Sequence, residues 1–285
     1  MKLGTTTIPI AGWVIDPTNP QAGRESRLKA IKKLVAGYGL SAVELTLDFN
    51  TVYPHIFNAE FYESVAQLQK ELGFVCTVHL PFMWLDCSSI NETIRQASVE
   101  CIRQVLKIIK PLYAETYVLH LWGSTTIQIM NAMEISRHKE QVMQAILAQA
   151  DRSLEELKKL IYPLNLCVEN LEAPSFDFVV PLIEKHNVSV CLDVGHLAYQ
   201  GGGEIGFLDR LGDRIREVHL HDALHKTSEG NIVDTKDHLA LGEGQIDYRA
   251  FMQKLIEVGF DEIVILENNS QYDLERSIAR VNDYF

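Results

Sequence analysis

The stretch Val188-Ser189-Val190-Cys191-Leu192-Asp193-Val194-Gly195-His196 is a short β-branched and apolar run that ends in a carboxylate and an imidazole. Seven other short runs rich in β-branched or apolar residues recur along the chain, and longer segments with helical periodicity lie between them. We predict strands at Lys2–Thr7, Ala42–Leu47, Val75–Leu80, Thr116–Leu121, Leu166–Asn170, Val188–Asp193, Arg216–His221 and Ile263–Asn268. We predict helices at Arg24–Ala36, Phe61–Leu72, Glu92–Ile109, Glu140–Ile161, Phe176–Lys185, Phe207–Arg210, Tyr248–Val258 and Asp273–Asp283.

Eight strands that alternate with eight helices are the content of one (β/α)8 barrel, the TIM-barrel fold. The chain has 285 residues, close to the length of about 250 that is typical of this fold. A doubly wound parallel sheet is the alternative, but it usually carries a glycine-rich phosphate turn after its first strand. Gly4-Thr5-Thr6-Thr7 lacks that pattern. Because we find no linker, repeat or low-complexity segment, we predict a single TIM-barrel domain over residues 1–285.

Composition and charge are those of a globular, acidic protein. The chain has 26 Lys and Arg against 38 Asp and Glu, and the resulting charge of −12 argues against nucleic-acid binding. Apolar residues make up 47% and charged residues 22%, as in ordinary globular domains. The five cysteines form no CxxC pair, which predicts no disulfide framework and a reducing compartment. The polar N-terminus and the lack of a long apolar run predict a soluble, cytoplasmic protein without a membrane partner.

The predicted strands end in imidazoles and carboxylates. In a TIM barrel the active site lies where the carboxyl ends of the strands meet, so these side chains are expected at one mouth. Each buried charge without a partner would lower the stability of the fold by several kcal/mol. Divalent cations would neutralise the carboxylates and remove this cost. The mixed imidazole and carboxylate set favours zinc, with manganese or iron as alternatives. The predicted metal ligands are His79, His120, Glu169, Asp193, His196, His219, His238 and Glu267.

Several motifs resemble the xylose isomerase-like barrel superfamily, and specifically its endonuclease IV branch. They run in order along the whole chain: Thr77-Val78-His79-Leu80-Pro81, Val168-Glu169-Asn170, Leu192-Asp193-Val194-Gly195-His196, Val218-His219-Leu220-His221-Asp222 and Leu241-Gly242-Glu243-Gly244. The resemblance implies that Glu169 bridges two zinc ions. It also implies that His79 and His120 bind the first ion, and that the second takes Asp193, His219 and Glu267.

The late loop departs from that family pattern. The endonucleases hold a third ion through a residue of the His196 type and an Asp-x-His pair, but here Lys236 stands where the aspartate belongs, two residues before His238. Asp237 is adjacent to His238 and would point elsewhere on an extended segment. Asp222 or Asp234 could replace the missing ligand. We therefore expect two tightly bound ions rather than three, with His196 and His238 as weak ligands or substrate contacts.

A closer likeness is to the cobamide-remodelling phosphodiesterases, in which Asp237-His238 would be the group's own arrangement. The main hypothesis is a metal-dependent phosphodiester hydrolase that acts on a small nucleotide-like phosphodiester, such as the nucleotide loop of a cobamide. Glu169 would then help to hold the nucleophilic water. An apurinic-site DNA endonuclease is less favoured, because the chain offers few Lys and Arg contacts for phosphates.

The alternative is a metal-dependent sugar or sugar phosphate isomerase or epimerase of the same superfamily. It would hold one ion, and Glu169 and Glu267 would be its paired acid and base. Either reaction takes a small-molecule substrate, and the sequence leaves the oligomeric state open. The expected substrate contacts are Glu44, Trp13, Trp84, Trp122 and His221.

Overall fold

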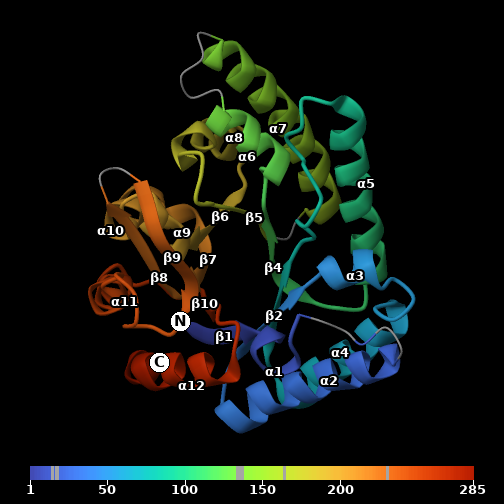
Figure 1. Cartoon of the computed structure of the whole chain (residues 1–285). Coiled ribbons are helices and arrows are strands. Elements are labelled where there is room, and N and C mark those ends of the chain that lie inside the picture. The colour runs from blue at the N-terminus through green and yellow to red at the C-terminus, as the bar shows by residue number, and fades with distance from the viewer. Residues whose placement is uncertain (14–15, 17–18, 133–137, 163–164, 229–230) are drawn as a thin grey trace.

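The computed structural model forms a closed barrel of parallel strands surrounded by helices (Figure 1). It describes residues 1–13, 16, 19–132, 138–162, 165–228 and 231–285. Eight strands close the barrel in the order β1-β10-β7-β6-β5-β4-β3-β2, and each neighbouring pair is parallel. The predicted (β/α)8 barrel is therefore confirmed.

The barrel strands lie within two residues of the predicted runs at either end. They are β1 (Lys2–Thr6), β2 (Ala42–Thr46), β3 (Val75–His79), β4 (Ala114–Leu119), β5 (Asn165–Glu169), β6 (Ser189–Asp193), β7 (Ile215–Leu220) and β10 (Ile263–Leu266). The register places Asp193 beside His219, and Glu169 beside Cys191. Because all the strands run the same way, their carboxyl ends meet at one mouth.

In the described part of the chain, eight helices form the outer layer, and four others follow strands at the mouth. The outer helices are α2 (Pro20–Lys32), α4 (Ala59–Leu72), α5 (Glu92–Ile108), α7 (Lys139–Ile161), α8 (Val180–His186), α10 (Glu204–Leu211), α11 (Tyr248–Glu257) and α12 (Gln271–Val281). The helices at the mouth are α1 (Ile8–Ala11), α3 (Asp48–Val52), α6 (Ser124–Ala132) and α9 (Val194–Tyr199). One π-helical turn, η1 (Lys33–Gly37), and three 3-10 turns, η2 (Phe176–Phe178), η3 (Gly212–Arg214) and η4 (Asn282–Tyr284), complete them.

Side-chain caps fix where several helices begin. The side chains of Asn58, Asn91, Asp247 and Ser270 each accept a bond from a backbone N–H in the first turn of the helix that follows. The predicted helix Phe176–Lys185 is instead a 3-10 turn followed by α8. Pro181 lies in the first turn of α8, where a backbone N–H has no partner within the helix and its absence costs nothing. In the middle of one continuous helix, the same proline would remove a hydrogen bond, so a new helix begins here.

The apolar core divides between the two faces of the strands. Outward-facing strand residues such as Val43, Val78 and Val218 pack with helix residues such as Ile31 and Leu154 in one large cluster. The barrel interior holds two small clusters, Ala42 with Ile263 and Ile265, and Val118 with Cys167 and Cys191. All five cysteines are unpaired. Among the described residues, none of the helices is long and apolar enough to cross a membrane.

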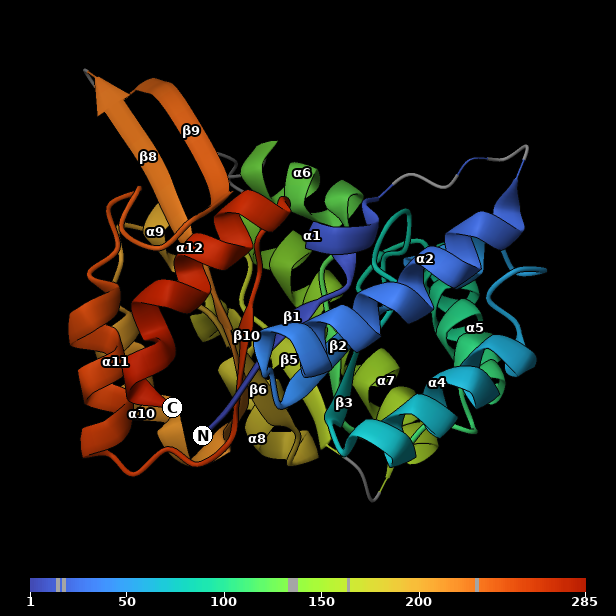
Figure 2. The same ribbon diagram turned by 90° about the horizontal axis from the view of Figure 1, so that it is seen from below.

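A two-stranded antiparallel hairpin interrupts the barrel after β7, where the sequence suggested only a loop. It consists of β8 (Asp222–Ser228) and β9 (Asn231–Leu239), and it projects from one end of the molecule (Figure 2). Its base returns the chain to the mouth before α11 begins. The hairpin therefore adds side chains to the mouth that no barrel strand carries.

Gly195, in the first turn of α9, lies directly against the imidazole of His221. A Cβ atom built on Gly195 would lie 1.9 Å from Cε1 of His221. We therefore expect Gly195→Ala to lower the free energy of unfolding by about 1–3 kcal/mol, the usual cost of overpacking. Thermal unfolding followed by circular dichroism measures the change.

Gly206→Ala is the matched control, because Gly206 lies in α10 and a Cβ there meets nothing within 4 Å. In a helix interior, Ala is favoured over Gly by about 1 kcal/mol, so this variant should be at least as stable as the parent. Equal melting temperatures for Gly195→Ala and the parent would show that the contact with His221 is not tight.

Candidate metal centre

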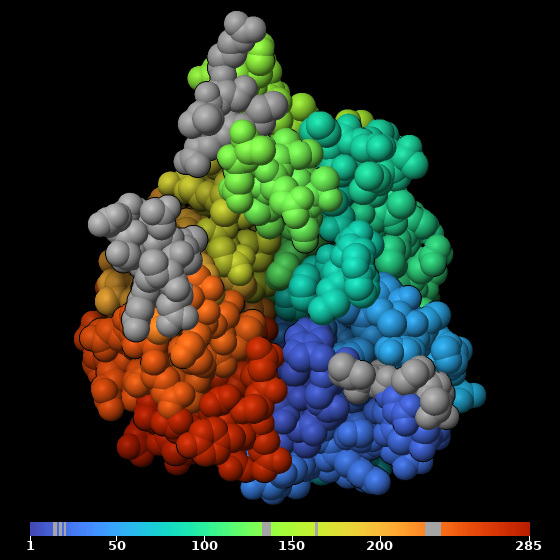
Figure 3. Space-filling model, in the orientation of Figure 1, coloured from blue at the N-terminus to red at the C-terminus, as the bar shows by residue number. Residues whose placement is uncertain are grey.

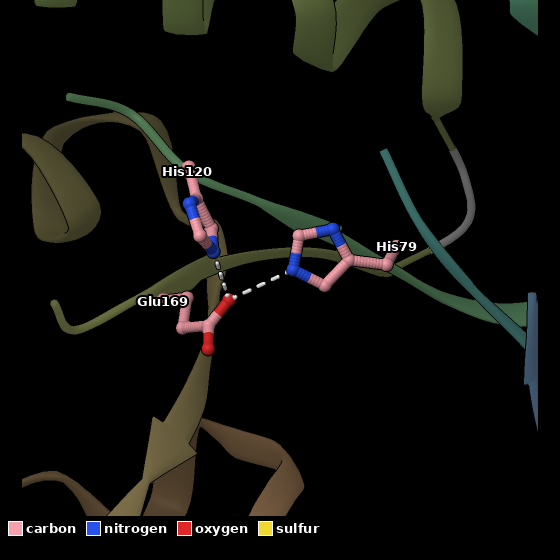
Figure 4. A group of neighbouring side chains, drawn as sticks. All are labelled: His79, His120 and Glu169. Atoms are coloured by element: carbon pink, nitrogen blue, oxygen red, sulfur yellow. Dashed lines mark hydrogen bonds and ion pairs between the residues drawn. The ribbon is translucent and has the colours of Figure 1, made fainter. Parts of the chain in front are cut away.

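The carboxylate of Glu169, the last residue of β5, is buried and lies among three imidazoles. Its Oε2 is 3.2 Å from Nε2 of His79 and 2.9 Å from Nε2 of His120, and both rings point at this one oxygen (Figure 4). Its Oε1 is 3.0 Å from Nδ1 of His219 on β7. Glu169 therefore links two groups of donor atoms on either side of it.

Local contacts fix the orientation of His79 and His120. Nδ1 of His79 donates to the carbonyl of Leu80 at 3.0 Å, which leaves Nε2 facing Glu169. The ring of Phe82 packs against both imidazoles, with centroids 4.9 Å from His79 and 4.5 Å from His120. A histidine whose second nitrogen is bonded to a carbonyl is oriented as metal-binding histidines usually are.

A second group of donors surrounds Nδ1 of His219. Carboxylate oxygens of Glu169, Glu267 and Asp193 lie 3.0, 3.4 and 3.9 Å from this nitrogen. The four side chains come from β5, β6, β7 and the end of β10, which are consecutive around the barrel. Three carboxylates so close together repel one another, and a divalent cation at their centre removes that repulsion.

Asp193 is held by hydrogen bonds on both sides. Its Oδ1 accepts from the backbone N–H of His196 at 2.6 Å and so caps α9. Its own N–H donates to the side chain of Asn170 at 2.9 Å, and the amide of Asn170 donates back to the Asp193 carbonyl at 2.8 Å. Asn170 thus ties the ends of β5 and β6 together, which places Glu169 and Asp193 side by side.

His196 reaches over the rim of the barrel from α9. Its Nε2 lies 3.6 Å from Oδ2 of Asp193 and 3.9 Å from Oε1 of Glu169. Its Nδ1 lies 3.1 Å from Oε1 of Glu172. Glu172 was not among the site residues predicted from the sequence. Glu172 sits three residues beyond the end of β5, in a loop where the strand-end pattern gives no signal.

The hairpin carries a β-bulge next to His238. β8 and β9 pair Asp222 with Leu239 but Leu224 with Lys236, so β9 holds one residue more than β8 between these pairs. His238 lies inside the bulge and has a φ of 53°, in the left-handed region. The bulge therefore turns two consecutive side chains toward the same side of β9.

Asp237 and His238 both reach the mouth, contrary to the prediction that Asp237 points elsewhere. Oδ1 of Asp237 lies 3.1 Å from Nδ1 of His221, and Nδ1 of His238 lies 3.8 Å from Oε2 of Glu267. Lys236, at the position of the endonuclease aspartate, is exposed. The prediction failed because side chains alternate only in a regular strand, and the bulge breaks the alternation.

His221 is buried between two carboxylates and does not line the cavity, so its placement does not support the expected substrate contact. Its Nε2 lies 3.2 Å from Asp193 and its Nδ1 3.1 Å from Asp237. The ring therefore connects the end of β6 to the hairpin. The imidazole of His221, just beyond β7, lies on the same face as that of His219. Gly195 of α9 packs against it, so it cannot contact a substrate in the cavity.

Asp222 is taken up by backbone hydrogen bonds and is not available as a replacement ligand. Its carboxylate accepts from the N–H groups of Ala223, Gly242 and Ile246 at 2.9, 2.7 and 3.1 Å. A Cβ on Gly244 would lie 2.3 Å from Oδ1 of Asp222, so this position requires glycine. The Leu241-Gly242-Glu243-Gly244 motif thus closes the base of the hairpin.

Burial and charge act in opposite directions on the ionisation of the site. Burial alone would raise the pKa of Glu169, but the facing imidazoles hold that pKa well below its usual range. Burial alone would lower the pKa of the imidazoles, but neighbouring carboxylates raise the pKa of His79 to about 9 and that of His196 to about 10. The pKa of His219 is likewise raised well above its usual value by the acidic groups around it.

A cavity of about 320 Å³ opens above these residues. Figure 3 shows this face of the molecule hollowed where the N-terminal segment (blue), the segment before α5 (teal) and the C-terminal third (orange to red) meet. Its lining includes the donor residues His79, His120, Glu169, His196, Asp237, His238 and Glu267. It also includes the apolar residues Ile8, Trp13, Phe82, Trp122, Ile127 and Leu171.

Two of the three tryptophans expected at the substrate line this cavity. Trp13 is 38% exposed, and its Nε1 donates to Oδ1 of Asn269 at 3.1 Å. Trp122 is buried in the wall. Trp84 is 79% exposed and lies outside the cavity, so the expectation fails for this residue. Its φ of 62° lies in the left-handed region.

Glu44 does not line the cavity either, contrary to the expected substrate contact. It is fully buried on β2, and its Oε2 lies 3.4 Å from Nε2 of His219. Glu44 lies two residues before the end of β2, so alternation points it inward but one layer below the mouth.

The donor set of the mouth suits a divalent metal ion. Groups whose ligand atoms all lie within 4.8 Å of one another include His79 with His120 and Glu169, Glu169 with Asp193 and His196, Glu44 with His219 and Glu267, Glu169 with Cys191 and His219, and His221 with Asp237 and His238. Imidazole nitrogens and carboxylate oxygens bind zinc, manganese and iron. The residues present therefore fit the metal that the fold implies.

Solved structures with the same fold include sugar epimerases. A D-tagatose 3-epimerase-like protein has a TM-score of 0.73 at 21% identity, over 100% of this chain and 97% of that one. The 3-keto-D-glucoside 4-epimerase YcjR from E. coli has a TM-score of 0.72 at 16% identity, over 99% of both chains. A D-psicose 3-epimerase from Clostridium cellulolyticum H10, solved with D-tagatose, has a TM-score of 0.69 at 16% identity, over 100% and 98%.

Sequence relatives include the uncharacterized protein MJ1311 from Methanocaldococcus jannaschii, 28% identical over 239 residues, 81% of this chain and 76% of the relative. An inosose dehydratase from Geobacillus kaustophilus is 29% identical over 118 residues, 38% of each protein. One from Lacticaseibacillus casei is 24% identical over 129 residues, 41% of this chain and 42% of the relative.

The family model described as a xylose isomerase-like TIM barrel matches residues 33–283. This range runs from the start of η1, just before β2, into the last turn of the chain, and it contains every predicted metal ligand. The match agrees with the barrel topology described above. The chain therefore belongs to the xylose isomerase-like TIM-barrel family.

Proposed function

We propose that this protein is a metal-dependent enzyme that moves a proton at a carbon next to a carbonyl group of a small polyhydroxylated substrate. The observation that carries the proposal is the convergence of Glu169, Asp193 and Glu267 on Nδ1 of His219. The likeness to sugar epimerases and inosose dehydratases supports the same class of reaction. This is the isomerase or epimerase alternative from the sequence; phosphodiester hydrolysis, its main hypothesis, gains no support from these relatives.

Four side chains, Glu169, Asp193, His219 and Glu267, would hold one divalent ion. When bound, this ion polarises the substrate carbonyl and stabilises the negative charge that develops on its oxygen. A catalytic metal site must also keep a coordination position open to substrate, and the cavity borders Glu169 and Glu267 directly.

Glu169 and Glu267 would be the paired base and acid. Their strands are three positions apart in the barrel order, so the two carboxylates approach a molecule in the cavity from different sides. One carboxylate removes the proton from the carbon next to the carbonyl, and the other returns a proton to the same or the neighbouring carbon. In a dehydration, the second group instead protonates a departing hydroxyl, which leaves as water.

The lining of the cavity suits a small carbonyl compound with hydroxyl groups. Asn269 and Glu172 line the cavity and offer polar atoms for hydroxyl groups. Trp13, Phe82 and Trp122 add apolar surface, and a bound substrate covered by them would be shielded from water, which strengthens charge interactions at the reacting atoms. His196 and His238 border the same space and are proposed as substrate contacts rather than ligands of a further ion.

A binuclear phosphodiester hydrolase is the second candidate, and one observation favours it. His79 and His120 both face Oε2 of Glu169 (Figure 4). Oε1 of Glu169 faces His219. A carboxylate with imidazoles on both oxygens can bridge two ions, and a single-ion isomerase does not need the second pair. In the isomerase proposal His79 and His120 bind substrate hydroxyl groups instead. Zinc would be the metal of the binuclear enzyme.

Hydrogen exchange at carbon tests the reaction class directly. Incubation with ketohexoses such as D-tagatose and D-psicose, and with an inosose, in D2O should replace the hydrogen next to the carbonyl by deuterium, measured by proton NMR. At saturating metal, Glu267→Gln should slow this exchange by about 10²–10⁴-fold, the usual contribution of an acid or base. Hydrolysis of bis(4-nitrophenyl) phosphate without any exchange would contradict the proposal and support the hydrolase.

Glu169→Gln should remove most of the bound metal, because the amide carries no charge to balance the ion. Metal content is measured by elemental analysis of the purified variant. Glu243→Gln is the control, since this carboxylate lies near the mouth but pairs with Arg276. If Glu169→Gln keeps the metal content of the parent, Glu169 is not a ligand.

Metal binding at neutral pH should release protons. The raised pKa of His219 keeps it protonated in the metal-free protein at pH 7, and a ligand nitrogen must be deprotonated, so one ion at this residue displaces about one proton. A second ion at His79, whose pKa is about 9, would displace a further proton. Titration calorimetry in buffers of different ionisation enthalpy counts the protons; no release would contradict His219 as a ligand.

A further inference from the structure

Glu44 is a buried carboxylate for which the proposed reaction has no use. It lies on the inner face of β2, is fully buried, and neither of its oxygens accepts a hydrogen bond from the described residues. An unpaired buried carboxylate is costly and is retained only where a partner uses it. The partner must therefore be looked for within the barrel.

The nearest imidazole nitrogen is Nε2 of His219, 3.4 Å from Oε2 of Glu44. His219 is also fully buried, and its Nε2 has no hydrogen-bond partner among the described residues. The two ring nitrogens thus face different groups: Nδ1 faces the carboxylates of the mouth, including Glu169 at 3.0 Å, and Nε2 faces the layer below. The carboxylate of Glu44 and Nε2 of His219 are therefore neighbours that both lack another hydrogen-bond partner among the described residues.

We propose that Glu44 is a positioning residue that accepts the Nε2 proton of His219 and so directs Nδ1 toward the ion. A histidine ligand usually donates its second N–H to a carboxylate or carbonyl, which fixes the tautomer and makes the ligating nitrogen more basic. His79 uses the carbonyl of Leu80 in this way. For His219, whose ring is enclosed by the barrel, the carboxylate of Glu44 on β2 would be the acceptor instead of a carbonyl.

Glu217 is the competing acceptor, and the geometry disfavours it. Its Oε1 lies 3.9 Å from Nε2 of His219, further than Glu44. Its Oε2 accepts a hydrogen bond from Thr116, which anchors the carboxyl group toward β4. Glu217 is buried on the same strand as His219, two residues earlier, so it matches Glu44 in side-chain type and in burial. It is therefore the control position.

The test measures metal affinity rather than turnover. Glu44→Gln and Glu44→Ala are compared with the parent and with Glu217→Gln, by competition for Zn²⁺ against a chromophoric chelator. We expect both Glu44 variants to bind Zn²⁺ about 10–100-fold more weakly, the usual effect of removing such a partner. Glu217→Gln should stay close to the parent. Circular dichroism and melting temperature establish that each variant is folded.

A second readout separates orientation from general damage to the barrel. In protein labelled with ¹⁵N-histidine, the Nε2-bound proton of His219 should give a downfield signal that exchanges slowly with water in the parent and in Glu217→Gln. That signal should disappear in Glu44→Ala, which has no side-chain acceptor. Parent-like affinity and signal in the Glu44 variants, or equal losses in Glu217→Gln, would overturn the proposal.

The inference rests on the proposed binding of an ion at His219, and the two can fail separately. If the parent binds no divalent ion, the proposed function fails, while the NMR signal of His219 still reports whether Glu44 holds the ring. If the parent binds the ion and exchanges hydrogen at carbon but Glu44→Gln is unchanged, only the role of Glu44 is wrong.

Discussion

The mouth of this barrel is built around one buried carboxylate, Glu169, that imidazoles approach from both sides. A charge in this position is tolerable only when it is neutralised, because desolvation costs several kcal/mol. The surrounding side chains meet that need in two ways. Protonated imidazoles balance the carboxylates when the protein is metal-free, and a divalent ion would replace those protons. The same charges that make the site costly therefore make it suited to a divalent ion.

The fold supplies this arrangement through strand order rather than through any single loop. Four neighbouring strands deliver Glu169, Asp193, His219 and Glu267, and the reciprocal bonds of Asn170 hold two of the strand ends in register. The hairpin then closes the mouth on the side of β7 and β10. Glu44, deeper in the barrel, does not line the cavity but faces His219 from below. Under the two proposals, ion binding and ligand orientation would therefore come from different depths of one barrel.

Much of this could be predicted from the sequence, because both the strands and their ends have a regular pattern. Inward-facing His and Glu at strand ends follow from alternation alone, and the barrel from the count of alternating elements. Two of the failures lie where the backbone leaves the regular pattern: Asp237 turned inward because of a bulge at His238, and Trp84 has a positive φ. Glu44 and His221 follow the alternation, but one lies below the mouth and the other is covered by α9. Bulges, depth and cover by a helix are all set by tertiary packing and leave no periodic signal.

The central claim is that one divalent ion binds among Glu169, Asp193, His219 and Glu267. The most direct test is anomalous diffraction from crystals of the metal-loaded protein at the absorption edge of that metal. The account predicts one peak per chain, with donor atoms of these residues at about 2.0–2.2 Å if the metal is zinc. A principal peak held by His79 and His120, or two peaks of equal height on either side of Glu169, would contradict it.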